Sequence, residues 1–442
     1  MSPLIIIIGL VGAIVIFINP FLGLLAIVGL MPQALVHTIS NMLFGVFTSI
    51  TPIKIIGGLT FLAVLLRSVT ERKNLDFLKK RQVKFFMFFL VWIFISGFTQ
   101  PCSFTRENFT YFASFAMLGF VILSLVTDLR KFRWVLWMSL ISMFIVSLQS
   151  IVNYSSYSVT MRMQGASYGP NYFAIILLPF VAISFYSIFT EKKLFKFLSL
   201  LCAVVIASAL ILTFSRGGLI GFFGMLLVAT LTAKRKVKSL LFVIVCLIIL
   251  ISIAPSQLWQ RLSMTKLQSE TRDVTVHSTQ DRLLHFKAAW RMFLANPLFG
   301  VGIGDYYWKC RDYAPVYPRR AHTMYLEIMA ELGIIGIFLF LGILFHTYKS
   351  LRKIMSSDSN LSCYARGLFI GLSGFLISAL FLHAQQERVL WFVIFMSAAL
   401  DIIYAKQLSN QRDKKGRRGK KFKRVKELDE FDEPANSTSY VS

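Results

Sequence analysis

Long apolar segments recur along this chain and constrain its fold more than any other feature. Each is near the ~20 residues that an α-helix needs to cross a bilayer, or somewhat shorter. Hydrophobic residues make up 56% of the 442 residues and charged residues 15%, which excludes an ordinary soluble domain. The sequence therefore predicts an all-α polytopic membrane protein with about 12 transmembrane helices, within a range of roughly 11 to 13.

The predicted spans are residues 3–30, 52–66, 83–98, 108–126, 134–152, 171–188, 194–212, 219–231, 240–253, 322–348, 364–382 and 389–404. The first of them is either one tilted span or a hairpin broken at Asn19-Pro20, because proline interrupts a helix. A hairpin there would add one span to the count.

The basic residues are distributed unevenly between the predicted spans. A net charge of +26 would suggest nucleic acid as the partner of a soluble protein, but here Lys and Arg fall in every second connection, as the positive-inside rule describes. Those connections are residues 67–84, 130–133, 192–196, 234–238, 349–353 and 406–426. We expect them to face the cytoplasm, where the basic tail meets membrane lipids and no nucleic acid.

This threading divides the chain into four parts. Residues 1–253 hold the N-terminal transmembrane helices, residues 254–321 form one large outside loop, residues 322–405 hold the C-terminal transmembrane helices, and residues 406–442 form a basic, disordered cytoplasmic tail. The outside loop carries ten Lys or Arg residues. Long loops translocate largely regardless of charge, so these residues do not contradict the threading.

An arginine stands between two apolar runs at Thr213-Phe214-Ser215-Arg216-Gly217-Gly218. A charge at membrane depth costs about 2.5–3.5 kcal/mol on insertion scales, so it is retained where it faces a protein interior, a polar cavity or an anionic ligand. Ser215 and the glycines leave room for a ligand to approach the backbone. The alternative is a turn at the membrane edge with a snorkelling arginine.

The outside loop contains a predicted amphipathic helix over residues 282–295. Residues 278–281 offer an N-cap, and Asn296-Pro297 ends the helix. Its apolar face comprises Phe286, Ala289, Trp290 and Phe293, with Arg282 on the same face. The G-x-G-x-G sequence of residues 300–304 lacks the spacing of a dinucleotide site, so we interpret it as a loop that lets this helix pack back.

Four short motifs follow one another between residues 162 and 336. They are Arg162-Met163-Gln164-Gly165 with Pro170-Asn171-Tyr172-Phe173-Ala174; Thr213-Phe214-Ser215-Arg216-Gly217; Arg282 with its helix, Asn296-Pro297 and Gly300-Val301-Gly302; and His322 with Leu326, Glu327 and Gly333. Together they resemble the O-antigen ligase and polysaccharide polymerase superfamily of bacterial envelope enzymes. Thr323 departs from the pattern, because many members carry asparagine after the histidine.

The resemblance implies a GT-C-like, inverting glycosyltransferase that uses neither a metal nor another cofactor. It would transfer a glycan from undecaprenyl diphosphate to an acceptor hydroxyl on a glycan, on lipid A-core or on a protein, at the periplasmic or outer face of the bacterial inner membrane. A polymerase that joins lipid-linked repeat units is the alternative within this class. A membrane transporter or flippase is the alternative outside it, although no internal repeat supports it.

The candidate site residues follow from these motifs. Arg216 and Arg282 would clamp the diphosphate, since arginine donates two parallel hydrogen bonds to phosphate oxygens, and His322 would accept the proton of the acceptor hydroxyl. The expected substrate-binding residues are Arg162, Tyr168, Asn171, Ser215 and Gly217.

The same residues also have structural interpretations. Arg282 could pair with Asp281 or Asp305, and His322 could bond to Asp305. Arg162 could anchor a lipid headgroup, and Asn171 could cap a helix. The remaining histidines have no partner at a useful spacing and are interpreted as structural; they are His37, His277, His285, His346 and His383.

Overall fold

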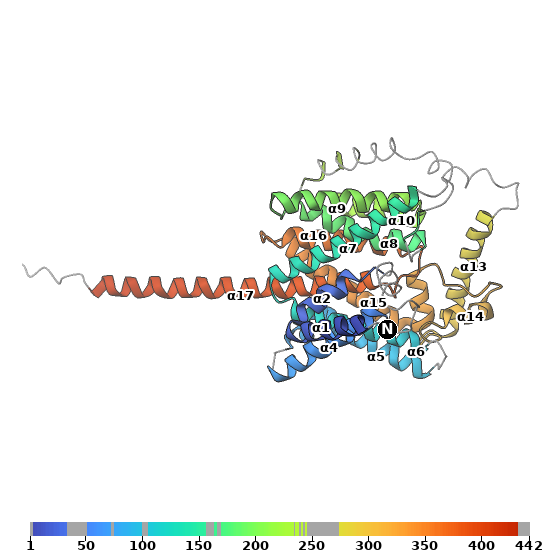
Figure 1. The fold of residues 1–442 in the computed structure, drawn as a ribbon, viewed down its shortest axis with the longest axis horizontal. Coiled ribbons are helices and arrows are strands. Elements are labelled where there is room, and N and C mark those ends of the chain that lie inside the picture. Colours follow the sequence, from blue (N-terminus) through green and yellow to red (C-terminus); the bar gives the residue numbers. More distant parts are fainter. Residues whose placement is uncertain are drawn as a thin grey trace, which may run out of the picture.

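The computed structural model describes residues 3–32, 51–71, 75–99, 105–155, 163–165, 169–233, 235–237, 240–241, 244 and 274–431. This described part of the chain is built from helices joined by short connections, and it contains no β-strand. The helices run side by side in one bundle, with two of them set across its end (Figure 1).

Eight helices in the described part are long and apolar enough to cross a membrane. They are α4 (Pro52–Thr70), α5 (Arg81–Thr99), α6 (Thr105–Leu125), α7 (Leu129–Ser155), α8 (Pro170–Ser187), α9 (Lys193–Leu212), α15 (Met324–Met355) and α17 (Arg388–Phe431). Shorter apolar helices accompany them; they are α1 (Pro3–Ile18), α2 (Pro20–Gly29), α10 (Arg216–Thr232) and α16 (Ser362–Ser378). The chain is therefore a multi-pass membrane protein. The predicted span at 240–253 lies almost wholly outside the described residues.

The first predicted span is broken in two. Helix α1 ends at Ile18, and the side chain of Asn19 accepts a hydrogen bond from the Phe21 N–H at 3.3 Å. Pro20 opens α2, where its missing N–H costs nothing. The chain bends so far at this point that a Cβ placed on Gly23 would lie 3.2 Å from the Ile16 side chain. Of the two alternatives for residues 3–30, the structure shows the broken one.

Aromatic side chains fill the centre of the bundle around Trp391, which is fully buried near the start of α17. The rings that pack against it come from α5, α6 and α15; they are Phe86, Phe89, Phe112, Phe115 and Phe340. The indole N–H donates to the Gln385 carbonyl at 2.8 Å, so the one polar atom of this cluster is satisfied. This packing fixes the connection between α16 and α17.

Helix α17 extends well beyond the bundle (Figure 1). It continues to Phe431, into the segment for which the sequence predicts a disordered tail. The Lys, Arg and Glu residues that dominate this segment are good helix formers, so a helix that begins in the bundle can propagate through them. At the opposite end of the bundle lie α13 (Val274–Ala295) and α14 (Tyr306–Tyr313).

Helix α13 begins at Val274, earlier than the predicted start at residue 282, and ends at Ala295 as predicted. Its buried face agrees with the predicted one at Ala289 and differs from it at Trp290. Ala288, Ala289 and Met292 pack towards α14, whereas Trp290 is 47% exposed. Small alanine side chains allow the helices to approach closely, which is why this face is buried in preference to the larger aromatic one.

The glycine-rich loop after α13 lies against α15. Gly300, Gly302 and Gly304 all have positive φ angles, of 70°, 102° and 84°. The N–H of Val301 donates to the Ala330 carbonyl at 3.0 Å, and the N–H of Gly302 donates to the Glu331 carbonyl at 3.0 Å. A Cβ on Gly300 would collide with the backbone of Glu331. The glycines thus serve close backbone packing, which agrees with the interpretation from the sequence.

Helix α15 is kinked where this loop meets it. Gly333 has a φ of 66° and interrupts the helical geometry, so the carbonyls before it are free to accept hydrogen bonds from the loop. On the other side of the kink, the Ile334 N–H donates to the Pro297 carbonyl at 2.8 Å. Loop and helix are thereby joined into one unit that carries the segment before α15.

Candidate active site

Arg216 opens helix α10, and its turn is tied to α8. Ser215 is the N-cap: its Oγ accepts from the Gly218 N–H at 3.2 Å and donates to Oδ1 of Asn171 at 3.0 Å. Phe214 has a positive φ of 49°, which bends the chain between α9 and α10. Asn171 therefore holds the turn, while the cap of its own helix is Gly169. The side chain of Arg216 itself is exposed at this end of the bundle.

The glycines after Arg216 have different surroundings. A Cβ on Gly218 would lie 2.5 Å from the Cβ of Ala174, so this glycine is needed for close packing of α10 on α8. A Cβ on Gly217 would meet Phe381 at 3.4 Å, an ordinary contact. Only Gly217 thus leaves space beside Arg216, and Gly218 has a packing role.

Arg282 lies on α13 and is half-buried. Burial lowers the pKa of its guanidinium, and the positive charge of Arg216 lowers it further. The carboxylates that could have neutralised Arg282 are engaged elsewhere: Asp281 pairs with Arg319 at 3.1 Å, and Asp305 pairs with Lys309 at 3.1 Å. Within the described part of the chain, no ion pair links a carboxylate to Arg216 or Arg282.

His322 lies in the segment before α15 and completes this group. Its φ is 56°, in the left-handed region that a side chain rarely adopts. Burial lowers the pKa of His322 to about 4, and the positive charge of Arg282 and the neighbouring His285 contribute to the shift. The imidazole is therefore neutral at neutral pH. The charge of Arg216 thus acts on Arg282, and the charge of Arg282 acts on His322.

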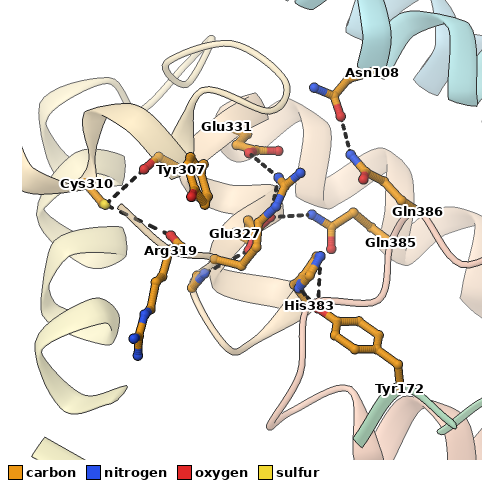
Figure 2. Close-up of polar contacts among 12 residues, drawn as sticks. Asn108, Tyr172, Tyr307, Cys310, Arg319, Glu327, Glu331, His383, Gln385 and Gln386 are labelled. Carbon is orange, nitrogen blue, oxygen red and sulfur yellow. Dashed lines mark hydrogen bonds and ion pairs between the residues drawn. The ribbon is translucent and has the colours of Figure 1, made fainter. Parts of the chain in front are cut away.

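A buried carboxylate holds the backbone that carries His322. Glu327, in the first turn of α15, accepts hydrogen bonds from the Ala321 N–H at 2.9 Å, from Arg320 at 3.2 Å and from Gln385 at 2.9 Å (Figure 2). Arg320 also lies 3.8 Å from Glu331, which is fully buried one turn further along the helix. These contacts anchor Arg320 and Ala321, the two residues before His322, to α15. Through Gln385 they also link this segment to the connection between α16 and α17.

A second histidine lies beside His322. The ring centroids of His285 and His322 are 5.8 Å apart, at an angle of 81°. The sequence assigned His285 no partner, yet it follows Arg282 by three residues, a spacing that puts both on one helix face. That spacing is the signal that could have identified it.

A third histidine contacts α8. The hydroxyl of Tyr172 is hydrogen-bonded to Nδ1 of His383, which lies in the connection between α16 and α17 (Figure 2). Burial lowers the pKa of His383 to about 4. Because Tyr172 follows Asn171, this pair joins the turn of Arg216 to the connection that also holds Gln385. No local sequence signal relates Tyr172 to His383.

Two of the expected substrate-binding residues, Arg162 and Tyr168, lie outside the described residues. Residues between them are described: the Met163 N–H donates to the Leu212 carbonyl at 3.4 Å, and a Cβ on Gly165 would lie 2.7 Å from the Phe173 ring. This segment therefore runs beside the end of α9, close to the turn that carries Arg216.

Residues 201–341 match a protein-family model described as O-antigen ligase. The matched region contains Arg216, Arg282 and His322, whereas Arg162, Tyr168 and Asn171 precede it. No curated protein matches the chain. The family match thus confirms the resemblance indicated by the sequence motifs, and the region that brings the two arginines and the histidine together is O-antigen ligase-like.

Proposed function

We propose that this protein is an O-antigen ligase-like enzyme of the bacterial inner membrane. It transfers a glycan from undecaprenyl diphosphate to an acceptor hydroxyl, by an inverting reaction that needs no metal ion. The family match supports a membrane enzyme of the ligase and polymerase type. The donor, the acceptor and the assignment of roles to residues are inferred from the chemistry of the site.

The observation that carries the proposal is the approach of Arg282 to Arg216 without a neutralising carboxylate. The positive charge of Arg216 disfavours the charge of the half-buried Arg282, and a diphosphate bound between them would remove that cost. Arginine suits this role because its planar guanidinium makes two hydrogen bonds to phosphate oxygens and stays charged. The two side chains are thus arranged for an anionic group that develops further charge as it leaves.

The reaction follows from this arrangement. His322, neutral and partly buried, accepts the proton of the acceptor hydroxyl. The acceptor oxygen forms a bond to the sugar carbon as the bond from that carbon to the phosphate oxygen breaks. The electron pair of the broken bond stays on the diphosphate, whose charge the two guanidinium groups stabilise. Attack from the face opposite the leaving group inverts the configuration of the carbon.

Donor binding would also prepare His322 as a base. The positive charge of Arg282 contributes to the low pKa of His322, and the negative charge of a bound diphosphate opposes that effect. The basicity of His322 therefore rises when the donor is in place. Proton removal from the acceptor is then coupled to occupancy of the donor site.

The site is assigned to the outer face of the membrane. The projecting end of α17 is rich in Lys and Arg, and such segments stay on the cytoplasmic side. Helices α13 and α14 lie at the opposite end of the bundle from this projection, which supports an outside location for Arg282 (Figure 1). Lipid-linked glycans, rather than nucleotide sugars, are the donors available there.

The test is glycan transfer by purified protein in liposomes. The donor is undecaprenyl diphosphate-linked glycan extracted from the native host, and the acceptor is supplied as lipid A-core or as a second lipid-linked glycan. Arg282→Ala should abolish transfer, whereas Arg311→Ala, at an exposed arginine of α14, should keep the native rate. Native activity of a folded Arg282→Ala protein would overturn the proposal. Transfer to lipid A-core would identify a ligase, and transfer to the second lipid-linked glycan would identify a polymerase.

A further inference from the structure

His285 occupies a position that the proposed reaction does not yet use. It is fully buried on α13, with its ring 5.8 Å from that of His322. Its surroundings fix which of its two nitrogens carries a proton, and they leave the other nitrogen with a free lone pair.

Tyr306 determines the tautomer of His285. The Tyr306 hydroxyl donates its single proton to the backbone carbonyl of His285 at 2.8 Å. The same oxygen lies 3.1 Å from Nδ1 of His285, so in this contact Nδ1 must be the donor. Burial raises the pKa of Tyr306 above its usual value, which keeps the hydroxyl protonated. Neutral His285 is therefore protonated at Nδ1, and its Nε2 bears a lone pair.

The Nε2 atom of His285 has no hydrogen-bond partner among the described residues, although it is buried. Oδ1 of Asp281 lies 3.7 Å from it. Two acceptors at this separation cannot bond to one another unless a proton arrives between them. Nε2 is thus a buried acceptor without a donor, and a proton placed on it would face Asp281.

Asp281 leads from this buried nitrogen towards solvent. Its side chain is 24% exposed, and its other oxygen pairs at 3.1 Å with Arg319, whose side chain is 62% exposed. The remaining charged or titratable groups around His285 are Arg282 on its own helix, His322, Tyr306, and Glu327 and Glu331 of α15, which act on Tyr306. Among them, Asp281 is the carboxylate within reach of Nε2.

We propose that His285 takes up the proton that His322 removes from the acceptor hydroxyl and passes it to Asp281. His285 is thus a positioning residue that acts through His322, and this inference rests on the proposed function. In the first step, the acceptor O–H bond breaks and a nitrogen of His322 gains the proton. In the second, His322 gives up a proton and the lone pair of His285 Nε2 gains it. In the third, Nε2 of His285 gives the proton to Asp281, and His285 returns to its Nδ1–H form. Asp281 then releases the proton to water.

The relay is tested in the full-length protein by single-turnover glycan transfer with the host-derived lipid-linked donor. His285→Asn keeps an N–H donor towards Tyr306 but lacks the second nitrogen. It should lower the single-turnover rate by about 10²-fold, at the lower end of general acid–base effects, without weakening donor binding. The matched control His346→Asn, in the distant half of α15, should transfer at the native rate.

A proton inventory separates a relay from a purely structural role. The wild-type rate plotted against the deuterium fraction of the solvent should be curved, because more than one proton moves, and the plot for His285→Asn should be linear. Tyr306→Phe provides a second variant, which removes the acceptor for the Nδ1 proton and should also slow transfer. A linear wild-type plot, or a native rate for either folded variant, would overturn the relay.

The two proposals fail separately. If Arg282→Ala transfers glycan normally, the proposed function is wrong, and the relay with it. If Arg282→Ala is inactive while His285→Asn is as fast as the wild type, only the relay is wrong. Thermal unfolding of each purified variant establishes that the comparison concerns folded protein.

Discussion

The guanidinium of Arg282 lies close enough to that of Arg216 for the charge of Arg216 to lower the pKa of Arg282. One arginine opens the apolar helix α10, and the other lies on α13, at the end of the bundle. Neither forms an ion pair with a carboxylate in the described part of the chain. An anionic ligand bound between the two guanidinium groups would remove this repulsion.

Arg216→Lys should lose most transfer activity although the charge is kept. An ammonium is a point donor and cannot make the planar two-bond contact with phosphate oxygens. Arg366→Lys is the matched control, since Arg366 donates to the Thr232 carbonyl at 3.0 Å, at the other end of α10. We expect that control to retain the native rate. A folded Arg216→Lys protein with native transfer would mean that the turn at Ser215 is structural.

The rate should depend on the protonation of His322. Burial and Arg282 lower the pKa of His322 to about 4, so kcat/KM should fall as the pH decreases through that value, where the free enzyme loses its base. Bound donor raises the pKa of His322, so the fall in kcat should begin at higher pH. His322→Ala should abolish this acid limb and leave a residual activity about 10²–10⁴-fold below the wild type. Coincident kcat and kcat/KM profiles would argue against coupling between donor and base.

The stability of the fold should depend on the same group. The folded pKa of His322 is below the ordinary value of 6.5, so the unfolded chain binds the extra proton more readily. The stabilisation is therefore fully present above about pH 6.5 and is lost as the pH falls towards 4. Thermal unfolding of wild type and His322→Ala across this window should show a smaller loss of stability in the variant.

Glu327→Gln should lower the free energy of unfolding of the protein, because Glu327 anchors the segment before His322. The carboxylate accepts hydrogen bonds from Ala321, Arg320 and Gln385, and the amide would leave Arg320 without its nearest charge partner. Breaking a buried ion pair of this kind costs about 3–5 kcal/mol. Asp358→Asn, at an exposed position after α15, should leave the unfolding temperature unchanged. Equal unfolding temperatures for the two variants would contradict an anchoring role for Glu327.

Transfer should persist in EDTA, since on the proposed function the two arginines would supply the positive charge that a divalent cation supplies in other polyprenyl-linked transferases. The measurement compares glycan transfer by the purified protein with and without the chelator. Loss of activity that magnesium or manganese restores would show that the arginines do not suffice for the diphosphate.

Alkaline-phosphatase fusions should report the orientation of the chain. A fusion at Gln268, in the predicted outside loop, should be active, and a fusion at Lys79, in a predicted cytoplasmic connection, should be inactive. The opposite pattern would place Arg282 on the side of the nucleotide sugars and would exclude a lipid-diphosphate donor.

The sequence by itself determined the helical, multi-pass character of this protein and the choice of candidate residues. Span length and apolarity are local properties, so helices such as α8 and α9 lie within one residue of their predicted bounds. Arg216 was identifiable as a charge between two apolar runs, whereas Arg282 and His322 were identified through the motifs that resemble the O-antigen ligase superfamily.

Only the tertiary structure decided how these residues meet. The position of His285 beside His322, the hydrogen bond from Gln385 to Glu327, and the contact between Tyr172 and His383 each join segments that are distant in sequence. The buried face of α13 likewise depended on its neighbours, because α14 packs on Ala288 and Met292 beside the predicted Ala289 and leaves Trp290 exposed. Local pattern shows which residues are chemically unusual, but packing between remote segments decides which of them share a site.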